Sequence, residues 1–322
     1  KYKNKISMNF LITGGGGYIG TKLTQHLLLK KNKVTIIDNC WFGNYHKKHK
    51  SLKVIKEDIR NFTKLNIKNI DIIIHLANVA NDPTVELNPT LSWEINVLCS
   101  KIIADYAIKN KVKKIIFLSS GSVYGVKKEN KVTEDLKLNP ISVYNKTKMV
   151  SERVLLSYKN DIDIKCIRPA TVCGLSERLR LDLTVNKLTF DGFYKNKIVV
   201  NGGDQIRPNV NIRDLIRAID HFIFTRKTFK HNIYNVGFEN FSILKIAEKI
   251  KKKTGAKIII KKIMDIRSYR QDSSRLIKTG FKPKFNIDYA IDELINYFNL
   301  KRKNDFGDRN YNLIKMKQLN VQ

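Results

Sequence analysis

The sequence predicts an α/β protein in which a doubly wound parallel sheet precedes a smaller α/β domain. Short apolar runs rich in β-branched residues recur through the first half of the 322 residues. Such runs are typical of strands buried on both faces of a parallel sheet. Longer helical patterns separate these runs, and strand–helix alternation of this kind builds a parallel sheet with helices on both faces. The length corresponds to about two domains.

The predicted elements follow in chain order. Strands of the first half are expected at residues 10–13, 34–37, 54–55, 72–77, 115–118 and 162–170, with helices over 18–30, 89–109 and 141–158. The second half is less regular, with helices expected near 181–195, 211–224, 241–254 and 288–298 and short strands near 198–200, 233–236 and 257–263. We therefore predict a first domain over 8–170, a second over 171–300 that is partly interleaved with it, and a polar tail without clear period over 301–322.

Composition excludes several classes of protein. The chain holds 61 Lys and Arg against 29 Asp and Glu, a formal charge of +32, and nucleic-acid-binding proteins share such an excess. However, 47 of the 61 are lysines spread along the chain, so we attribute the excess to compositional bias and expect no nucleic-acid partner. No apolar run approaches the ~18 residues of a membrane span, so no membrane association is expected. The four cysteines form no C-x-x-C pair, which fits a reducing cytoplasm.

A glycine-rich turn joins the first predicted strand to the first predicted helix. Residues 13–20 read TGGGGYIG and place glycines in a G-x-x-G-x-x-G spacing. Glycine permits a tight turn and lets backbone N–H groups approach a pyrophosphate at the start of the helix. This context predicts a Rossmann-type domain whose cofactor lies against Gly14, Gly17, Tyr18, Ile19 and Gly20.

Acidic residues follow the next two strands. Asp38, followed by Asn39, ends the second predicted strand, where a carboxylate would accept hydrogen bonds from the adenosine ribose and repel a 2′-phosphate. NAD is therefore expected rather than NADP, although nearby Lys47 and Lys48 could hold a phosphate. Asp58, after the third strand, either lies near the adenine or caps the next helix.

The sequence contains a Y-x-x-x-K motif at Tyr144 and Lys148. Four residues make about one helical turn, so both side chains share a face. An ammonium beside a phenol favours the phenolate, which would make tyrosine a plausible general base. The motif recurs elsewhere in this lysine-rich chain, but only Tyr144 starts a helix shortly after the strand that leads into Ser119-Ser120-Gly121-Ser122. Position therefore selects Tyr144.

Together these motifs resemble the extended short-chain dehydrogenase/reductases, in particular the NAD-dependent nucleotide-sugar epimerase/dehydratase family. The resemblance runs from about Met8 to Phe298 and includes TGGGGYIG, IIDN, EDIRN, HLAN at 75–78, SSGSVYG and RPATVCG at 168–174. It implies that Ser120, Tyr144 and Lys148 are the catalytic residues and that Lys148 also binds the nicotinamide ribose. It further implies cofactor contacts by Ile59, Leu76, Ala77 and Asn96, and a homodimer formed through the helices at 89–109 and 141–158.

On the substrate side, the resemblance implies residues that hold the diphosphate of a nucleotide-sugar. Asn186 falls where such enzymes place an asparagine on a phosphate, and Arg207 and Arg270 match arginines that reach the pyrophosphate. Guanidinium groups bind phosphates through paired hydrogen bonds, so this assignment is chemically reasonable. Ser122 is expected beside Ser120 at the sugar. The stretch from Leu175 to Asn186 also resembles a subgroup that acts on nucleotide-linked heptoses, some of which only oxidise C4.

Other residues narrow the reaction. Gly121 and Ser122 stand where sugar 4,6-dehydratases carry an acid pair and where C3 or C5 epimerases carry a cysteine or acid, so these reactions are disfavoured. Cys173 is expected to be a packing residue. His46 and His49 have metal-like spacing but no third ligand beside them, so no metal site is expected.

The predicted function is a reversible oxidation at the sugar C4 that gives the C4 epimer through a 4-keto sugar. Tyr144 removes the hydroxyl proton, Ser120 holds the same oxygen, and NAD accepts the hydride. If the keto sugar leaves, the enzyme is instead a nucleotide-sugar 4-dehydrogenase or ketoreductase, which the same residues would serve. A non-catalytic protein that binds NAD or nucleic acid is an alternative of another class, and the intact Ser120, Tyr144 and Lys148 set argues against it.

Overall fold

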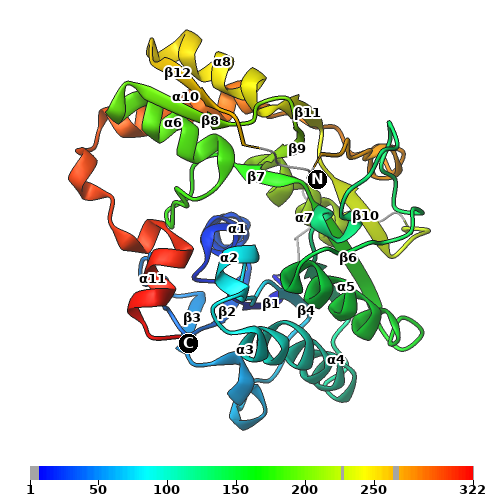
Figure 1. Ribbon diagram of the computed structural model, residues 1–322. Coiled ribbons are helices and arrows are strands. Elements are labelled where there is room, and N and C mark those ends of the chain that lie inside the picture. The colour runs from blue at the N-terminus through cyan, green and yellow to red at the C-terminus, as the bar shows by residue number, and fades with distance from the viewer. Residues whose placement is uncertain (1–6, 226–227, 264–267, 322) are drawn as a thin grey trace, which may run out of the picture.

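The structure is a computed structural model that describes residues 7–225, 228–263 and 268–321. Its centre is a seven-stranded parallel sheet with the order β10-β6-β5-β4-β1-β2-β3 (Figure 1). The sheet confirms the predicted fold class. Its strands are β1 (Asn9–Thr13), β2 (Lys33–Asp38), β3 (Leu52–Lys56), β4 (Ile72–His75), β5 (Lys114–Leu118), β6 (Asp163–Pro169) and β10 (Ile233–Val236).

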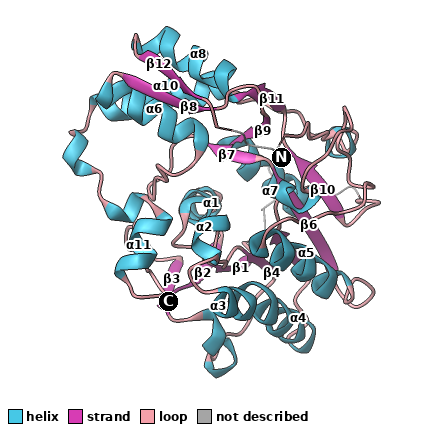
Figure 2. Cartoon of the chain, viewed as in Figure 1, coloured by secondary structure: helices cyan, strands magenta, loops and turns pink. Residues whose placement is uncertain are grey.

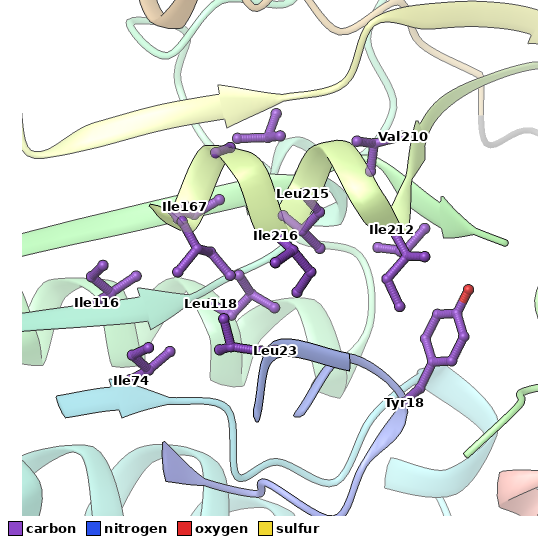
Figure 3. Packing of buried hydrophobic residues seen from close by; sticks show 14 of the residues in the cluster. Tyr18, Leu23, Ile74, Ile116, Leu118, Ile167, Val210, Ile212, Leu215 and Ile216 are labelled. Carbon is purple, nitrogen blue, oxygen red and sulfur yellow. The ribbon is translucent and has the colours of Figure 1, made fainter. Parts of the chain in front are cut away.

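Side chains from alternate strand positions enter two hydrophobic cores, one on each face of the sheet. Phe10 and Ile12 of β1 pack with Leu23 and Leu27 of α1 (Tyr18–Leu29), whereas Leu11 packs on the opposite face with Ile103 of α4 (Cys99–Lys109). The first core also receives α7 (Ile212–Phe224), as Figure 3 shows for Leu215 and Ile216 packed near β5 and β6, and the second core lies under α5 (Val143–Leu156). Burial on both faces explains why these strands read as apolar runs.

The helix predicted over 89–109 is divided into three parts. It consists of α3 (Pro89–Trp93), a π-helical turn at Glu94–Leu98 and α4. Two further short helical turns, α2 (Asp82–Val85) and the 3₁₀ turn Gly121–Tyr124, lie at the carboxyl ends of β4 and β5. π-helical turns inside α-helices occur often near functional sites, and this one carries Asn96.

The second half of the chain also forms two small sheets, with helices packed beside them (Figure 2). β7 (Thr171–Cys173), β9 (Ile206–Asn211) and β11 (Glu239–Ser242) form one sheet, and β8 (Lys197–Asn201) pairs with β12 (Lys257–Lys261). α6 (Thr184–Lys195), α8 (Ile243–Thr254) and α10 (Ile287–Asn299) pack around a third core that includes Val185, Ile246 and Ile291. The short helix α9 (Ser274–Ile277) lies beside β10.

Two segments of the second half add detail that the sequence did not predict. The strand at 233–236 joins the main sheet beside β6, so the chain returns to the main sheet after it has formed β7, β8 and β9. The polar tail contains a helix, α11 (Asn312–Gln318), in which Asn312 and Met316 are buried. No hydrophobic period marks α11 because it is only seven residues long and one of its two buried residues, Asn312, is polar. None of the described helices combines the length and apolarity needed to cross a membrane.

Candidate functional site

Two adjoining cavities lie at the carboxyl ends of the main sheet, beside the point where strand order reverses between β1 and β4. Open α/β sheets bind ligands at such reversals. The first cavity, of about 910 Å³, borders the glycine-rich turn, and the second, of about 890 Å³, borders Ser120 and Tyr144. Both are lined by Tyr18, Ile19, Leu76, Asn78, Ala80, Leu118 and Arg180, so they share one wall.

The glycine-rich turn forms the floor of the first cavity. Gly14 has a φ of +73°, and a Cβ there would lie 2.6 Å from the backbone nitrogen of Ala77. A Cβ on Gly20 would lie 2.6 Å from the Gly14 carbonyl oxygen. Gly17 is the N-cap residue of α1 and supplies no side-chain cap, so the first N–H groups of the helix face the cavity. This arrangement fits the phosphates of a dinucleotide.

Asp38 lines the same cavity beside the glycine-rich turn. Its carboxylate accepts hydrogen bonds from the backbone N–H of Gly16 at 2.9 Å and of Cys40 at 2.7 Å. Burial raises the pKa of Asp38, and these two bonds oppose the rise. Backbone donors hold the carboxylate in place, and its remaining lone pairs can accept from ribose hydroxyls. Asn39, Ile59 and Ala77, also predicted cofactor contacts, line this cavity too.

The predicted catalytic residues come together in the second cavity. Ser120 follows β5, its hydroxyl is 2.7 Å from that of Ser122, and it lowers the pKa of the Tyr144 phenol. Ser142 caps α5 by accepting from the backbone N–H of Asn145, which fixes the turn that carries Tyr144. Ser120, Ser122, Tyr144 and Lys148 all line this cavity.

Electrostatics at Tyr144 differ from the sequence expectation. Burial raises the pKa of Tyr144 to about 12, opposed by the hydrogen bond with Ser120 and by the charge of Arg180. Lys148 instead donates to the carbonyl oxygen of Leu118 at 2.7 Å, and burial lowers its own pKa to about 7. The protein alone therefore does not activate the phenol through Lys148, because burial of both groups outweighs their proximity along one helix face.

Several predicted contacts lie outside the residues that line the two cavities. Asp58 caps the 3₁₀ turn Ile59–Lys64 and pairs with Arg60, as the capping alternative predicts, and its contact with the adenine stays a prediction. Asn96 is buried, accepts from the backbone N–H of Val79 at 2.8 Å and donates to the hydroxyl of Thr147 at 3.0 Å. It joins the wall of the first cavity to α5.

The three predicted diphosphate ligands are not gathered together. Asn186 is buried, and its amide bonds to the backbone of Gly174 and Arg180 rather than facing a cavity. Arg207 lies on β9 near Tyr269, a lining residue of the second cavity, and its charge lowers the pKa of that phenol. Arg270 is exposed, and its carbonyl oxygen accepts from Val132.

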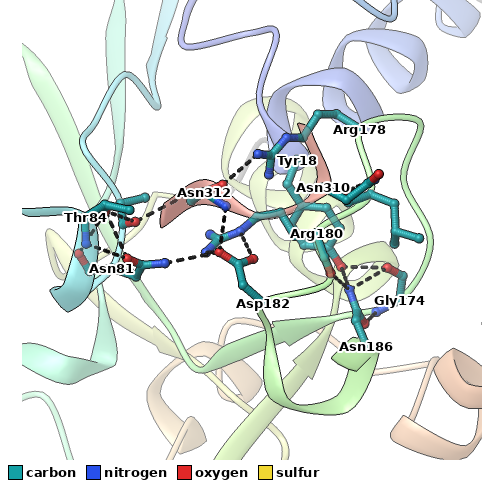
Figure 4. A network of polar contacts seen from close by, with 12 residues as sticks. Tyr18, Asn81, Thr84, Gly174, Arg178, Arg180, Asp182, Asn186, Asn310 and Asn312 are labelled. Carbon is teal, nitrogen blue, oxygen red and sulfur yellow. Dashed lines mark hydrogen bonds and ion pairs between the residues drawn. The ribbon is translucent and has the colours of Figure 1, made fainter. Parts of the chain in front are cut away.

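Residues of a different segment reach the cavities instead (Figure 4). Arg178 lines the first cavity and Arg180 lines both, and Arg180 forms a two-point ion pair with Asp182 at 2.9 and 3.0 Å. Asn312 of the tail also lines the first cavity and donates to Asp182 through its backbone N–H. The pair of arginines just after β7 was a sequence signal for these contacts, but nothing local marked Asn312.

Among the described residues, no group of three His, Cys, Asp or Glu side chains could hold a metal ion. The ring of His46 bonds to the carbonyl oxygen of Gly15 at 3.0 Å, which ties its loop to the glycine-rich turn.

Comparison with known proteins gives the same family as the motifs. The profile of the NAD dependent epimerase/dehydratase family matches residues 10–237. A putative UDP-glucose 4-epimerase of Methanocaldococcus jannaschii is 28% identical over 300 residues, covering 89% of this chain and 97% of that protein. The UDP-glucose 4-epimerase of Lactobacillus helveticus is 28% identical over 315 residues, with coverage of 88% and 95%.

Solved structures agree. The UDP-glucuronic acid 4-epimerase of Bacillus cereus, in complex with UDP-glucuronic acid and NAD, superposes with a TM-score of 0.78 at 26% identity and covers 91% of this chain and 99% of that one. A UDP-glucose 4-epimerase of Thermotoga maritima, at 23% identity and a TM-score of 0.81, has the same fold, with coverage of 91% and 99%. The matched profile spans more than half of the sequence and includes the glycine-rich turn and the Tyr144 helix, so the chain belongs to the NAD-dependent epimerase/dehydratase family and uses NAD as its cofactor.

Proposed function

We propose that this protein is an NAD-dependent nucleotide-sugar epimerase that acts at C4 of the sugar. The observation that carries the proposal is the placement of Ser120, Tyr144 and Lys148 in a cavity that shares a wall with the dinucleotide cavity. A sugar in the second cavity would thus meet a hydroxyl pair on one side and the cofactor on the other. NAD, when bound, supplies a reversible hydride acceptor there.

Ser120 and Tyr144 have different roles at the C4 hydroxyl of the sugar. Ser120 donates to the sugar oxygen and orients it, with Ser122 hydrogen-bonded beside it. Tyr144 accepts the hydroxyl proton as C4 becomes a ketone and returns it when C4 is reduced on the other face. The raised pKa of Tyr144 means that it needs nearby positive charge to act as a base at neutral pH. Arg180 and the oxidised nicotinamide are the sources of that charge, while Lys148 is proposed to hold the nicotinamide ribose.

The surroundings of Ser120 disfavour loss of water. A Cβ on Gly121 would lie 2.9 Å from both the Gln271 side-chain oxygen and the Tyr269 hydroxyl, so an acidic side chain here would have to displace these two groups. Cys173, a conceivable alternative base, is fully buried in the third core and lines neither cavity. Dehydration needs an acidic and a basic side chain that reach neighbouring carbons of the sugar, and neither Gly121 nor Cys173 supplies one.

The relatives support the sugar class. The two similar curated proteins carry the names UDP-glucose 4-epimerase and putative UDP-glucose 4-epimerase, and the Bacillus cereus neighbour is a UDP-glucuronic acid 4-epimerase. We propose that residues 8–170 hold NAD and that residues 171–300 close over the nucleotide-sugar, with Arg207 and Arg270 directed toward its diphosphate.

We also propose that α4 and α5 form the contact of a homodimer. Leu98 and Ile108 are exposed there.

A panel assay tests the proposal. The purified protein with NAD is incubated with UDP-, GDP- and dTDP-linked hexoses and with nucleotide-linked heptoses, and the products are assigned by NMR. We expect one or more substrates to reach an equilibrium mixture of two C4 epimers. Accumulation of a 4-keto sugar with one NADH per turnover would instead identify a 4-dehydrogenase, and no conversion with any substrate would contradict C4 chemistry.

A further inference from the structure

We infer that Arg178 binds the phosphates of the dinucleotide and that the C-terminal tail positions its guanidinium through Asn312. This assignment concerns cofactor binding alone, so it does not depend on which sugar reaction follows. It rests on four features of the described residues: where the Arg178 segment lies, what surrounds the guanidinium, which anion the cavity admits, and how the tail is fastened.

The segment that carries Arg178 is fastened across the first turn of α1. The phenol of Tyr18 donates to the carbonyl oxygen of Gly174 at 2.7 Å. The hydroxyl of Ser176 donates to the carbonyl oxygen of Tyr18 at 2.7 Å and lies 2.8 Å from the hydroxyl of Thr21. Two residues later, Arg178 lines the same cavity as the start of α1. The guanidinium and the positive end of the helix therefore face one space.

The guanidinium of Arg178 is buried without an ion pair among the described residues, although the more distant charges of Asp182 and Asp38 act on it. Only 2% of the residue is exposed, and the group lies 4.2 Å from the centre of the Phe42 ring. Its Nε has no hydrogen-bond partner within the described chain, and no ion pair to it occurs there, whereas the neighbouring Arg180 is paired with Asp182. Burial and the charge of Arg180 lower the pKa of Arg178 to about 9. A buried cation without an ion pair is costly, so this one calls for an anion.

The first cavity can hold a phosphate group of the dinucleotide against Arg178. Phosphates bind at the open N–H groups of a helix start, and a guanidinium opposite them would complete the site with charge-assisted hydrogen bonds. A 2′-phosphate is a poorer candidate, because the carboxylate of Asp38 lies where the adenosine ribose is expected and would repel it. The pyrophosphate of the dinucleotide is therefore the anion that we assign to Arg178.

The tail holds the guanidinium in place. The side-chain oxygen of Asn312 accepts from Nη2 of Arg178 at 2.6 Å, and its amide nitrogen donates to the carbonyl oxygen of Ala80 at 3.4 Å (Figure 4). Asn310 pairs with the same segment through the backbone of Leu179 and Leu181, at 2.9 Å each. The tail thus connects the arginine to the opposite wall of the cavity.

Calorimetric binding to the full-length protein, freed of bound dinucleotide, tests the assignment with adenosine, ADP and NAD as probes. We expect Arg178→Met to weaken ADP and NAD by at least tenfold and to leave adenosine unchanged, because adenosine has no phosphate. Arg178→Lys should fall between, since it keeps the charge but loses the fork. Arg302→Met, which removes an exposed arginine of the tail, is the matched control and should bind all three probes normally.

Folding and coupling separate this role from a structural one. Arg178→Met should unfold at the same or a higher temperature, because it removes a buried charge that has no ion pair; a purely structural arginine would leave a less stable protein. Asn312→Ala should weaken ADP binding less than Arg178→Met does, and should add nothing in the Arg178→Met background. Unchanged ADP and NAD binding in Arg178→Met, an equal loss for adenosine, or full additivity with Asn312→Ala would overturn the inference.

Discussion

The hydroxyl of Ser120 and the phenol of Tyr144 line one cavity, and Ser120 lowers the pKa of that phenol, although the two residues come from different elements. Ser120 follows β5, and Tyr144 lies in the first turn of α5. The start of α5 is fixed by its cap Ser142, whose hydroxyl donates to Asp82 at 2.5 Å. One sugar oxygen placed between the two hydroxyls would therefore meet a donor and a proton acceptor at once.

Removal of the phenol hydroxyl should stop turnover while leaving binding intact. We expect Tyr144→Phe to bind NAD normally and to lower kcat by about 10²-fold or more, the usual contribution of a general base. Steady-state kinetics and NAD titration measure the two effects. Tyr297→Phe, which alters another Y-x-x-x-K tyrosine on α10, is the control and should keep kcat. Near-normal turnover in Tyr144→Phe would move catalysis to another residue.

The charge of Arg180 should set the pH at which Tyr144 works. Because that charge lowers the pKa of Tyr144, Arg180→Met should raise the pKa and move the rising limb of the kcat/KM–pH profile to higher pH. Asp182→Asn removes the carboxylate that pairs with Arg180 and leaves the positive charge of Arg180 in place. The rising limb of the kcat/KM–pH profile of this variant should therefore move to lower pH. If both variants have the wild-type profile, Arg180 does not act on the base.

The buried, protonated Lys148 should lower the stability of the folded protein, although catalysis requires this residue. Its pKa is lowered from 10.5 to about 7 by burial. The penalty is therefore full below pH 7 and fades as the pH rises toward 10.5, because the folded state sheds the proton first. We expect Lys148→Met to be inactive yet more stable at pH 6, by on the order of 1 kcal/mol, with a smaller gain at pH 9. A variant less stable than wild type at pH 6 in urea unfolding would refute this view.

Asp38 should decide the choice of dinucleotide. Asp38→Ala removes the ribose acceptor and the repulsion of a 2′-phosphate, so NAD binding should weaken and relative use of NADP should rise. Because the carboxylate also accepts from Gly16 and Cys40, Asp38→Asn serves as the comparison that keeps one acceptor oxygen. An unchanged ratio of kcat/KM for NAD and NADP in both variants would remove this role from Asp38.

The sequence predicted the main sheet well because its strands are buried on both faces and its glycine-rich turn has a fixed spacing. Ser120, Tyr144 and Lys148 could be selected because each follows from its place after β5 or at the start of α5. The pKa of Tyr144 could not be predicted in the same way. It depends on burial and on Arg180, which lies 36 positions away in the sequence.

The contribution of the C-terminal tail to the site was the main feature that the sequence did not predict. Asn312 enters the first cavity through contacts with Arg178 and Asp182, more than 100 residues earlier in the chain. No local pattern encodes such a contact, because α11 is only seven residues long and the contact is made by an asparagine, a residue type that is mostly exposed in proteins. For Asn186, the resemblance predicts a phosphate contact, and the structure adds hydrogen bonds from its amide to the backbone of Gly174 and Arg180.

The central claim, chemistry at C4 without loss of water, is tested most directly by incubating the enzyme with its nucleotide-sugar and NAD in D₂O and following the products by mass spectrometry. An epimerase should give a product of unchanged mass without deuterium, because the hydrogen on C4 returns to the same carbon without meeting solvent. A product lighter by one water, or one that carries deuterium at C5, would contradict the account.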